Sequence, residues 1–150
     1  MKLEGMDKVL ARLNSEIAGI KNRTKKGMVT AALLVKGDAM RQTPRDLSNL
    51  VSSAYTEHNW QKFSESVPKY RGPAAEKLAA EHSSRKAEGR EEIAGVDGLV
   101  STIGYTAYYA PFVHEIQKNY TVGNWQFLRN ALANNEAKII GILKNEAQIK

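Results

Sequence analysis

The segment 103–115 places the strongest constraint on the fold of this 150-residue chain. It holds three of the six tyrosines and one of the three phenylalanines, and such a concentration of large aromatic side chains is typical of a core or an interface. Residues 99–105 alternate with the two-residue period of a half-buried strand, whereas from Thr106 onwards the spacing suits a turn of helix, with Pro111 tolerated only near its start. The segment therefore passes from strand to helix, and both parts must pack on something. Burial in the core alone would explain these aromatics.

Length and composition favour one domain over residues 1–150, because a chain of this size buries roughly two thirds of the surface of its unfolded form. The absence of cysteine excludes disulfides and cysteine metal sites. The chain shows no long apolar run, and residues 1–10 lack the apolar region of a signal peptide. We therefore expect a soluble protein that is synthesised in a cytoplasm and has no membrane contact.

Two helices are expected before residue 43. The first, over residues 5–21, carries an apolar stripe at helical spacing that should face the core. The stripe comprises Met6, Val9, Leu10, Leu13, Ile17 and Ile20. The polar residues 22–26 interrupt it, with Thr24 as the N-cap of a second helix. That second helix should end at Gln42, because Pro44 disfavours helical geometry at the residue before it.

Residues 54–58 are expected to form a strand that pairs with residues 99–106. The intervening stretch 60–98 is too long for a hairpin turn and is interpreted as an insertion. Pro73 is well placed as the first residue of a helix over 74–87, but Leu78 is the only large aliphatic side chain of that helix. We therefore expect the helix to bury little surface, and to be either an exposed excursion or an arm that becomes ordered against a neighbouring subunit.

The last helix, expected from Trp125 to near the C-terminus, has the clearest pattern, with Asn124 as its N-cap. Its apolar residues recur at steps of three and four, with Asn135 as the one polar interruption. They are Leu128, Leu132, Ile139, Ile142, Leu143 and Ile149. The expected fold class is α+β: a small antiparallel sheet with the N-terminal and long C-terminal helices packed on one face, plus a partly helical insertion.

The net charge of +6 is concentrated near the N-terminus. Residues 1–45 contain ten Lys and Arg against four acidic residues. The densest basic cluster consists of Lys21, Arg23, Lys25 and Lys26. Such a cluster suits an acidic partner or nucleic-acid phosphates. A solvated helix end is the alternative, and no aromatic residue is interleaved in the cluster for stacking on bases.

The sequence gives little support to catalysis. His58, His82 and His114 lie in three separate segments, and neither a phosphate loop nor a nucleophile-elbow motif is present. His114 and Glu115 come nearest to an acid–base pair, but neighbours on a helix diverge by about 100° and do not converge on one substrate. We expect no catalytic, metal-binding or cofactor-binding residues, and no cofactor.

Three short motifs in chain order carry a family resemblance. The first is a corner over residues 43–53, of the form Thr-Pro-x-Asp-x-(Gly or Ser)-x-Leu-x-x-Ser. The second is the aromatic run 109–115, Tyr-Ala-Pro-Phe-Val-His-Glu, and the third is 127–132, Phe-Leu-Arg-Asn-Ala-Leu, at the start of the last helix. In this order, the motifs resemble the tail-completion, or head-tail joining, family of long-tailed double-stranded DNA bacteriophages.

The resemblance implies a virion structural protein and not an enzyme. It implies a subunit of a ring at the neck, a cyclic homo-oligomer such as a hexamer or dodecamer, in contact with other neck, connector and tail proteins. Genomic DNA would pass through the lumen without specific binding. The motif residues carried over as interface candidates are Tyr109, Phe112, Glu115 and Phe127, although motif residues can equally serve folding. The charge pattern keeps a second hypothesis open, a small basic nucleic-acid-binding protein with the basic cluster on phosphates.

Overall fold

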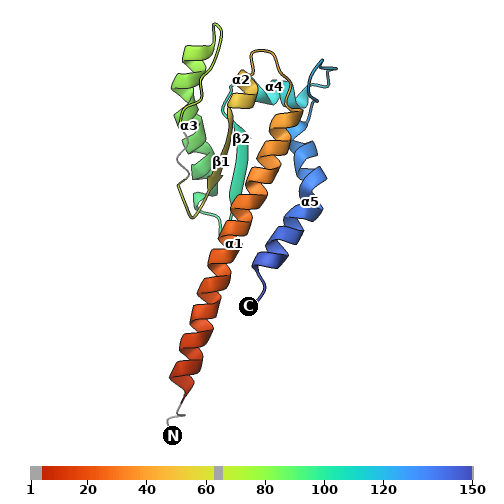
Figure 1. Cartoon of the computed structure of the whole chain (residues 1–150). Coiled ribbons are helices and arrows are strands. Elements are labelled where there is room, and N and C mark those ends of the chain that lie inside the picture. Colours follow the sequence, from red (N-terminus) through yellow and green to blue (C-terminus); the bar gives the residue numbers. More distant parts are fainter. Residues whose placement is uncertain (1–4, 63–65, 150) are drawn as a thin grey trace.

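The computed structural model describes residues 5–62 and 66–149 of the chain. A two-stranded antiparallel sheet has α1 (Met6–Gln42) on one side, together with α5 (Phe127–Glu146), and α3 (Ala75–Ala94) on the other (Figure 1). The short helices α2 (Asn49–Ser52) and α4 (Ala110–Glu115) lie at one end. The expected α+β class is confirmed. The N-terminal and C-terminal helices also pack against each other.

One continuous helix replaces the two that were predicted before residue 43, so the predicted interruption at 22–26 is wrong. That segment contains neither proline nor glycine, and the loss of an apolar stripe does not by itself break a helical backbone. Thr24, the predicted N-cap, instead donates its hydroxyl to the Ile20 carbonyl one turn earlier, at 2.9 Å. The helix ends at Gln42 as predicted, because Thr43 is extended before Pro44.

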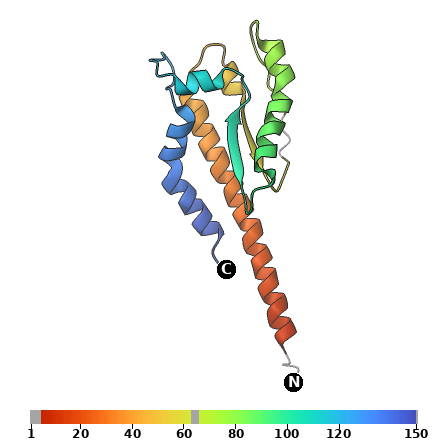
Figure 2. The same cartoon turned by 180° about the vertical axis from the view of Figure 1, so that it is seen from behind.

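Residues 6–20 of α1, here called the projecting half, extend beyond the rest of the fold (Figures 1 and 2). The prediction that their apolar stripe faces a core is therefore wrong. The stripe residues Val9 and Ile17 are 67 % and 55 % exposed. The same helix is buried further along its length, at Gly27, Ala31, Ala32, Val35 and Ala39. Periodicity shows which side of a helix is apolar, but it does not show whether another element covers that side.

The sheet consists of β1 (Ala54–His58) and β2 (Ser101–Tyr105), with Ala54 opposite Tyr105 and His58 opposite Ser101. The predicted pairing of residues 54–58 with residues 99–106 is confirmed. Every residue of β1 is buried, whereas β2 is partly exposed. Ile103 and Tyr105 of β2 pack towards the cluster that α1 and α5 form with Val35, Ala39 and Ala131.

The helix of the 60–98 stretch is longer than predicted, and the expectation that it buries little surface is wrong. α3 packs on the sheet opposite α1 (Figure 2), where Leu78 joins the main core. Lys86 Nζ lies 3.3 Å from the Glu57 carboxylate in a buried ion pair. Gly89 lets the Tyr55 ring lie directly against the helix, since a Cβ there would collide with the tyrosine. Close approach and buried polar pairs therefore replace the large aliphatic side chains that the helix lacks.

α5 buries Phe127, Ala131 and Asn135. Leu132, predicted on the buried stripe, is 55 % exposed, because it follows the buried Ala131 and points about 100° away from it. Asn135, the apparent interruption of the stripe, lies at the α1 interface. Its Nδ2 donates to Asp38 Oδ2 of α1 and to the Ala131 carbonyl, both at 2.8 Å.

Candidate functional site

The motifs that carry the resemblance meet at one end of the molecule. This clasped end comprises the corner 43–53, α4 and the loop 116–126 (Figure 1). Tyr105, the last residue of β2, places its hydroxyl 2.8 Å from Thr43 Oγ1. Thr43 gives its own hydrogen to the Ala39 carbonyl at 2.7 Å, so Tyr105 is the donor in this pair. Burial raises the pKa of Tyr105 to about 12, with the bond to Thr43 acting in the opposite direction.

The loop 116–126 closes over the corner through backbone contacts. The Asn124 N–H donates to the Gln42 carbonyl at 2.7 Å, which satisfies one of the last carbonyl groups of α1. Gly123 has a φ of +87°, and a Cβ there would lie 2.5 Å from the Pro44 nitrogen. Both the conformation and the space therefore require glycine.

Phe127 is a core residue. It is 1 % exposed, and its ring meets Tyr105 and His114 edge-on, with centroid distances of 5.0 Å and 4.9 Å. Its assignment as an interface residue is therefore wrong for the folded chain. The third motif serves folding, because it fastens the start of α5 to the end of β2.

Tyr109 lines a groove at the clasped end, whereas Glu115 lines a separate, smaller pocket beside Phe127 and Leu128. The groove has a volume of about 440 Å³ and is lined by the corner, by the segment before α3, and by Tyr109, Val113 and Tyr120. Burial raises the pKa of Tyr109, and Tyr108, Tyr70 and Asp46 act in the same direction. Phe112 is 66 % exposed, and Glu115 is exposed as well. Tyr109, Phe112 and Glu115 are thus accessible to a partner, in contrast to Phe127.

The geometry of the corner explains two positions of the first motif. Ser48 has a φ of 62°, in the left-handed region that glycine adopts with least strain, which explains why glycine suits this position of the motif. Asn49 is buried and exchanges two hydrogen bonds with the backbone of Arg71, at 2.6 Å and 2.8 Å. These bonds hold the segment before α3 against the corner.

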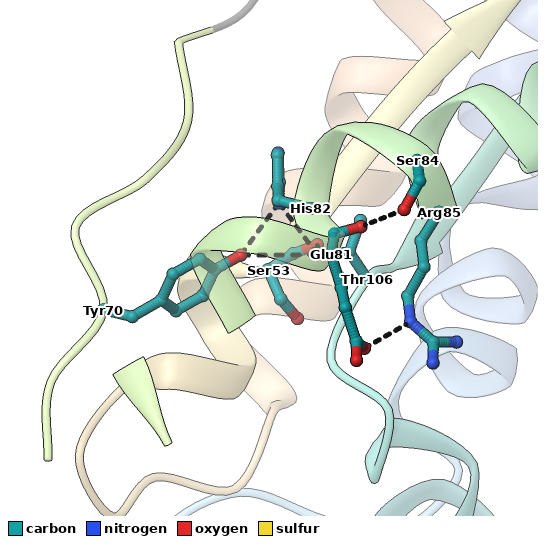
Figure 3. Close-up of polar contacts among 7 residues, drawn as sticks. All are labelled: Ser53, Tyr70, Glu81, His82, Ser84, Arg85 and Thr106. Carbon is teal, nitrogen blue, oxygen red and sulfur yellow. Dashed lines mark hydrogen bonds and ion pairs between the residues drawn. The ribbon is translucent and has the colours of Figure 1, made fainter. Parts of the chain in front are cut away.

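A buried polar network ties α3 to the clasped end (Figure 3). His82 Nδ1 lies 2.8 Å from both Thr106 Oγ1 and the Tyr70 hydroxyl. Thr106 Oγ1 also donates to the Ser53 carbonyl at 3.4 Å. Burial raises the pKa of Tyr70, and its hydrogen bond to Thr106 lowers it. Sequence spacing does not reveal these partners of His82, because Tyr70 lies in the loop before α3 and Thr106 directly follows β2.

The His114 imidazole is occupied by contacts within the chain. Its Nδ1 lies 2.6 Å from Glu115 Oε1, while its Nε2 is buried and lacks a hydrogen-bond partner among the described residues. The neighbouring side chains therefore do meet, through the Nδ1 nitrogen of the ring. Across residues 5–62 and 66–149, His, Cys, Asp and Glu nowhere gather in threes as metal ligands. In the same residues, no helix combines the length and apolar character that crossing a membrane requires.

The four residues of the basic cluster do not act as one surface. Arg23 binds the end of α5, with Nε 3.3 Å from the Glu146 carbonyl and Nη2 2.8 Å from the Gln148 carbonyl. It also forms an ion pair with Glu16 at 3.2 Å. Lys21 is exposed, whereas Lys25 and Lys26 border a depression of about 590 Å³ that also includes Trp60 and Gln61.

Trp60 supplies the aromatic residue that the basic cluster lacks in the sequence. Its ring stacks on His58 with a centroid distance of 4.8 Å, and it borders the depression beside Lys25 and Lys26. Sequence spacing gives no hint of this proximity, because the tryptophan follows β1 and the lysines belong to α1. Burial lowers the pKa of His58, and Glu57 acts in the opposite direction.

A second apolar surface lies on α5 and is called here the α5 shoulder. It borders a groove of about 520 Å³ lined by Arg129, Leu132, Ala133, Glu136, Ile139 and Ile140. Next to it, a groove of about 430 Å³ runs between α5 and β2, with Val35 and Ile103 among its walls. Leu132 and Ile140 are both exposed. The chain thus carries unlike apolar surfaces on α1 and α5.

Comparison of the chain with protein-family models, with curated proteins and with solved structures finds no match.

Proposed function

We propose that the chain is a structural subunit of a phage virion, located at the neck between head and tail after synthesis in the host cytoplasm. In this role it forms a closed ring, such as a hexamer or dodecamer, and has no enzymatic activity. The proposal rests on the resemblance carried by residues 43–53, 109–115 and 127–132.

The observation that most supports an assembly role is the exposed stripe of the projecting half. Five of its apolar side chains are each about half exposed or more: Met6, Val9, Leu10, Leu13 and Ile17. Together they leave roughly 500 Å² of apolar surface, the size of the largest patch on a typical monomer. A continuous patch of this kind on a protruding helix suits a subunit whose burial is completed by other chains.

The clasped end offers a separate surface for neck, connector or tail neighbours. Its exposed apolar residues are Leu47, Phe112, Ile116 and Val122. Leu47 lines the groove together with Tyr109 and Tyr120. A ring with one such surface on each subunit presents a repeated apolar rim, which suits stacking on another ring.

Electron microscopy of the purified chain, combined with native mass measurement, tests this proposal. We expect closed rings of fixed subunit number, or stacks of such rings, at micromolar concentration. A chain that remains at its monomer mass of 16.6 kDa over the same concentration range would contradict the proposal.

The depression that Trp60 forms with Lys25 and Lys26 favours a second candidate function, nucleic-acid binding. Lysines contact phosphates and a tryptophan stacks on bases, which is how many proteins hold single strands. Under the neck proposal, DNA is expected to bind no more tightly than about 10⁻⁶ M at physiological salt, the range of non-specific contacts. Tighter single-strand binding in fluorescence anisotropy, lost on Trp60→Ala and in Lys25→Gln/Lys26→Gln, would favour the second function.

A further inference from the structure

The apolar stripe of the projecting half continues the face of α1 that packs on α5. Successive positions 6, 10, 13, 17, 20, 24, 27 and 31 follow alternating steps of four and three residues, which keeps them on one side of a helix. Gly27 of this series lies against Leu143 and Glu146 near the end of α5. The stripe is therefore a helix-packing face whose second half has a partner in the chain and whose first half has none among the described residues.

The projecting half cannot be covered by its own α5. Arg23 fixes the end of α5 through the Glu146 and Gln148 carbonyls, next to the point where the projecting half begins. α1 is continuous from Met6 to Gln42, so the projecting half leads away from the domain (Figure 1). Within residues 5–62 and 66–149, no element covers it, and we look for its cover on a second copy of the chain.

The α5 shoulder matches the projecting half in size and character. Residues 129–140 span roughly 18 Å of helix and residues 6–20 roughly 22 Å, at 1.5 Å per residue. Glu16 borders the stripe of the projecting half, and Arg129 and Glu136 line the groove of the shoulder. An antiparallel arrangement therefore brings Glu16, which is paired with Arg23 of its own chain, towards Arg129 of the next copy, as in interfaces with complementary potentials.

We infer that the projecting half of one copy packs antiparallel on the α5 shoulder of the next copy. This contact repeats between copies the antiparallel α1–α5 packing found within the chain. The contact is heterologous, because each copy uses its projecting half on one neighbour and its α5 shoulder on the other. Heterologous contacts generate rings when the rotation between successive copies adds up to a full turn. The inference deepens the proposed function and rests on it for the closure of the ring.

Pairing of two projecting halves with each other is the main alternative, and it fits less well. The positions that flank the seam of such a pair hold Asp7, Val9, Asn14, Glu16 and Lys21, and Glu16 is already in an ion pair with Arg23 of its own chain. The stripe also spans only about two heptads, fewer than the three or four that indicate a coiled coil. Pairing of two projecting halves would moreover leave the α5 shoulder exposed.

The expected contact is modest in size. Covering the projecting half with a shoulder of similar area buries on the order of 1,000 Å² in total, below the standard size of specific interfaces. A single contact of this size is weak, whereas in a closed ring every copy makes it twice. We therefore expect assembly to depend steeply on protein concentration.

Two variants with complementary defects test the inference. One carries Leu13→Glu and Ile17→Glu and has a defective projecting half; the other carries Leu132→Glu and Ile140→Glu and has a defective shoulder. All four residues are exposed, so both variants should fold, which circular dichroism and thermal unfolding confirm. Leu33→Glu is the matched control, since Leu33 is an exposed leucine of α1 that lies away from the stripe.

Sedimentation velocity reads out the masses. We expect each double variant alone to lose assembly by about 100-fold or more in concentration, as loss of central apolar anchors does, while Leu33→Glu assembles like the unmodified chain. An equimolar mixture of the two variants should give a species of twice the 16.6 kDa chain mass that grows no further. In that species, the intact projecting half of the shoulder variant packs on the intact shoulder of the other variant.

Other outcomes overturn the inference or separate it from the proposed function. If the shoulder variant alone still dimerises and the mixture gives no new species, the projecting halves pair with each other. If both variants assemble normally while the unmodified chain forms rings, the inference fails and the neck proposal stands. If the mixture gives the species of twice the chain mass but the unmodified chain forms only open filaments, the inference stands. The proposal of a closed ring is then wrong.

Discussion

Replacement of Gly123 by alanine should destabilise the protein more than replacement of any other glycine with the same backbone conformation. Gly123 has a φ of +87°, and its missing Cβ would lie 2.5 Å from the Pro44 nitrogen and 2.6 Å from the Gln42 carbonyl oxygen. A side chain in the left-handed region costs roughly 1–2 kcal/mol. Displacement of packed neighbours costs about 1–3 kcal/mol more. Gly123→Ala should therefore lower the free energy of unfolding by about 2–5 kcal/mol, taking the two costs together.

Two other glycines separate these contributions. Gly98 has nearly the same φ, +88°, but nothing lies within 4 Å of its missing Cβ, so Gly98→Ala should show the backbone cost alone, about 1–2 kcal/mol. Gly95 has an ordinary φ of −96° and open space, so Gly95→Ala should change stability by less than about 0.5 kcal/mol.

Urea unfolding followed by far-ultraviolet circular dichroism measures all three variants on one scale, provided that the denaturant slopes agree. Hydrogen exchange at Asn124 adds a local readout, because the N–H of that residue bonds the Gln42 carbonyl. We expect its exchange to accelerate in Gly123→Ala and to follow only the global change in Gly98→Ala. The close packing of the loop on the corner is refuted if Gly123→Ala costs no more than Gly98→Ala.

Three further predictions follow from the core and the polar network. Phe127→Ala should cost about 3–5 kcal/mol and Leu132→Ala less than about 0.5 kcal/mol in the same unfolding assay; similar costs would show that α5 packs on another face. His82→Ala leaves two buried hydroxyls without their imidazole, so limited trypsin digestion should cut α3 faster, and an unchanged rate would contradict the network's role. The pKa of Tyr105 is raised from 10.0 to about 12, so its contribution to stability is complete below about pH 10 and is lost as the pH rises through 12, because the unfolded chain releases the proton first. Tyr105→Phe should make this alkaline decline shallower, and an unchanged decline would show that the hydroxyl is not buried.

Local rules predicted the parts of the fold that depend on neighbouring residues. Pro44 determines the end of α1 because it acts on the residue directly before it. The bounds of β1 and its pairing with β2 follow from strand composition and from the alternation in residues 99–105. The class of fold follows in turn, since a short sheet with long amphipathic helices must bury one side of each.

Long-range proximity was beyond the same rules. Trp60 and Lys25 line one depression, and His82 lies beside Thr106. Both placements depend on how α1, α3 and the sheet pack, which no local pattern encodes. The stripe of the projecting half shows this most clearly, because its spacing is that of a buried helix while its partner is absent from the described chain. For α3 the error is in the opposite direction. Its few large aliphatic side chains led us to predict an exposed helix, yet α3 is packed on the sheet, because Gly89 lets the Tyr55 ring approach closely and Lys86 pairs with Glu57.

The continuity of α1 has a mechanical consequence. A 37-residue helix is roughly 55 Å long, and its two ends belong to surfaces with different tasks. Gln42 is held by the loop over the corner, whereas the projecting half lies at the far end. A tilt of about 5° at the corner moves the tip of a lever of this length by about 5 Å, comparable to one helical turn. Because α1 is packed on α5 and on the sheet, a contact at the clasped end that tilts the whole subunit would displace the projecting half by that amount while the fold stays unchanged.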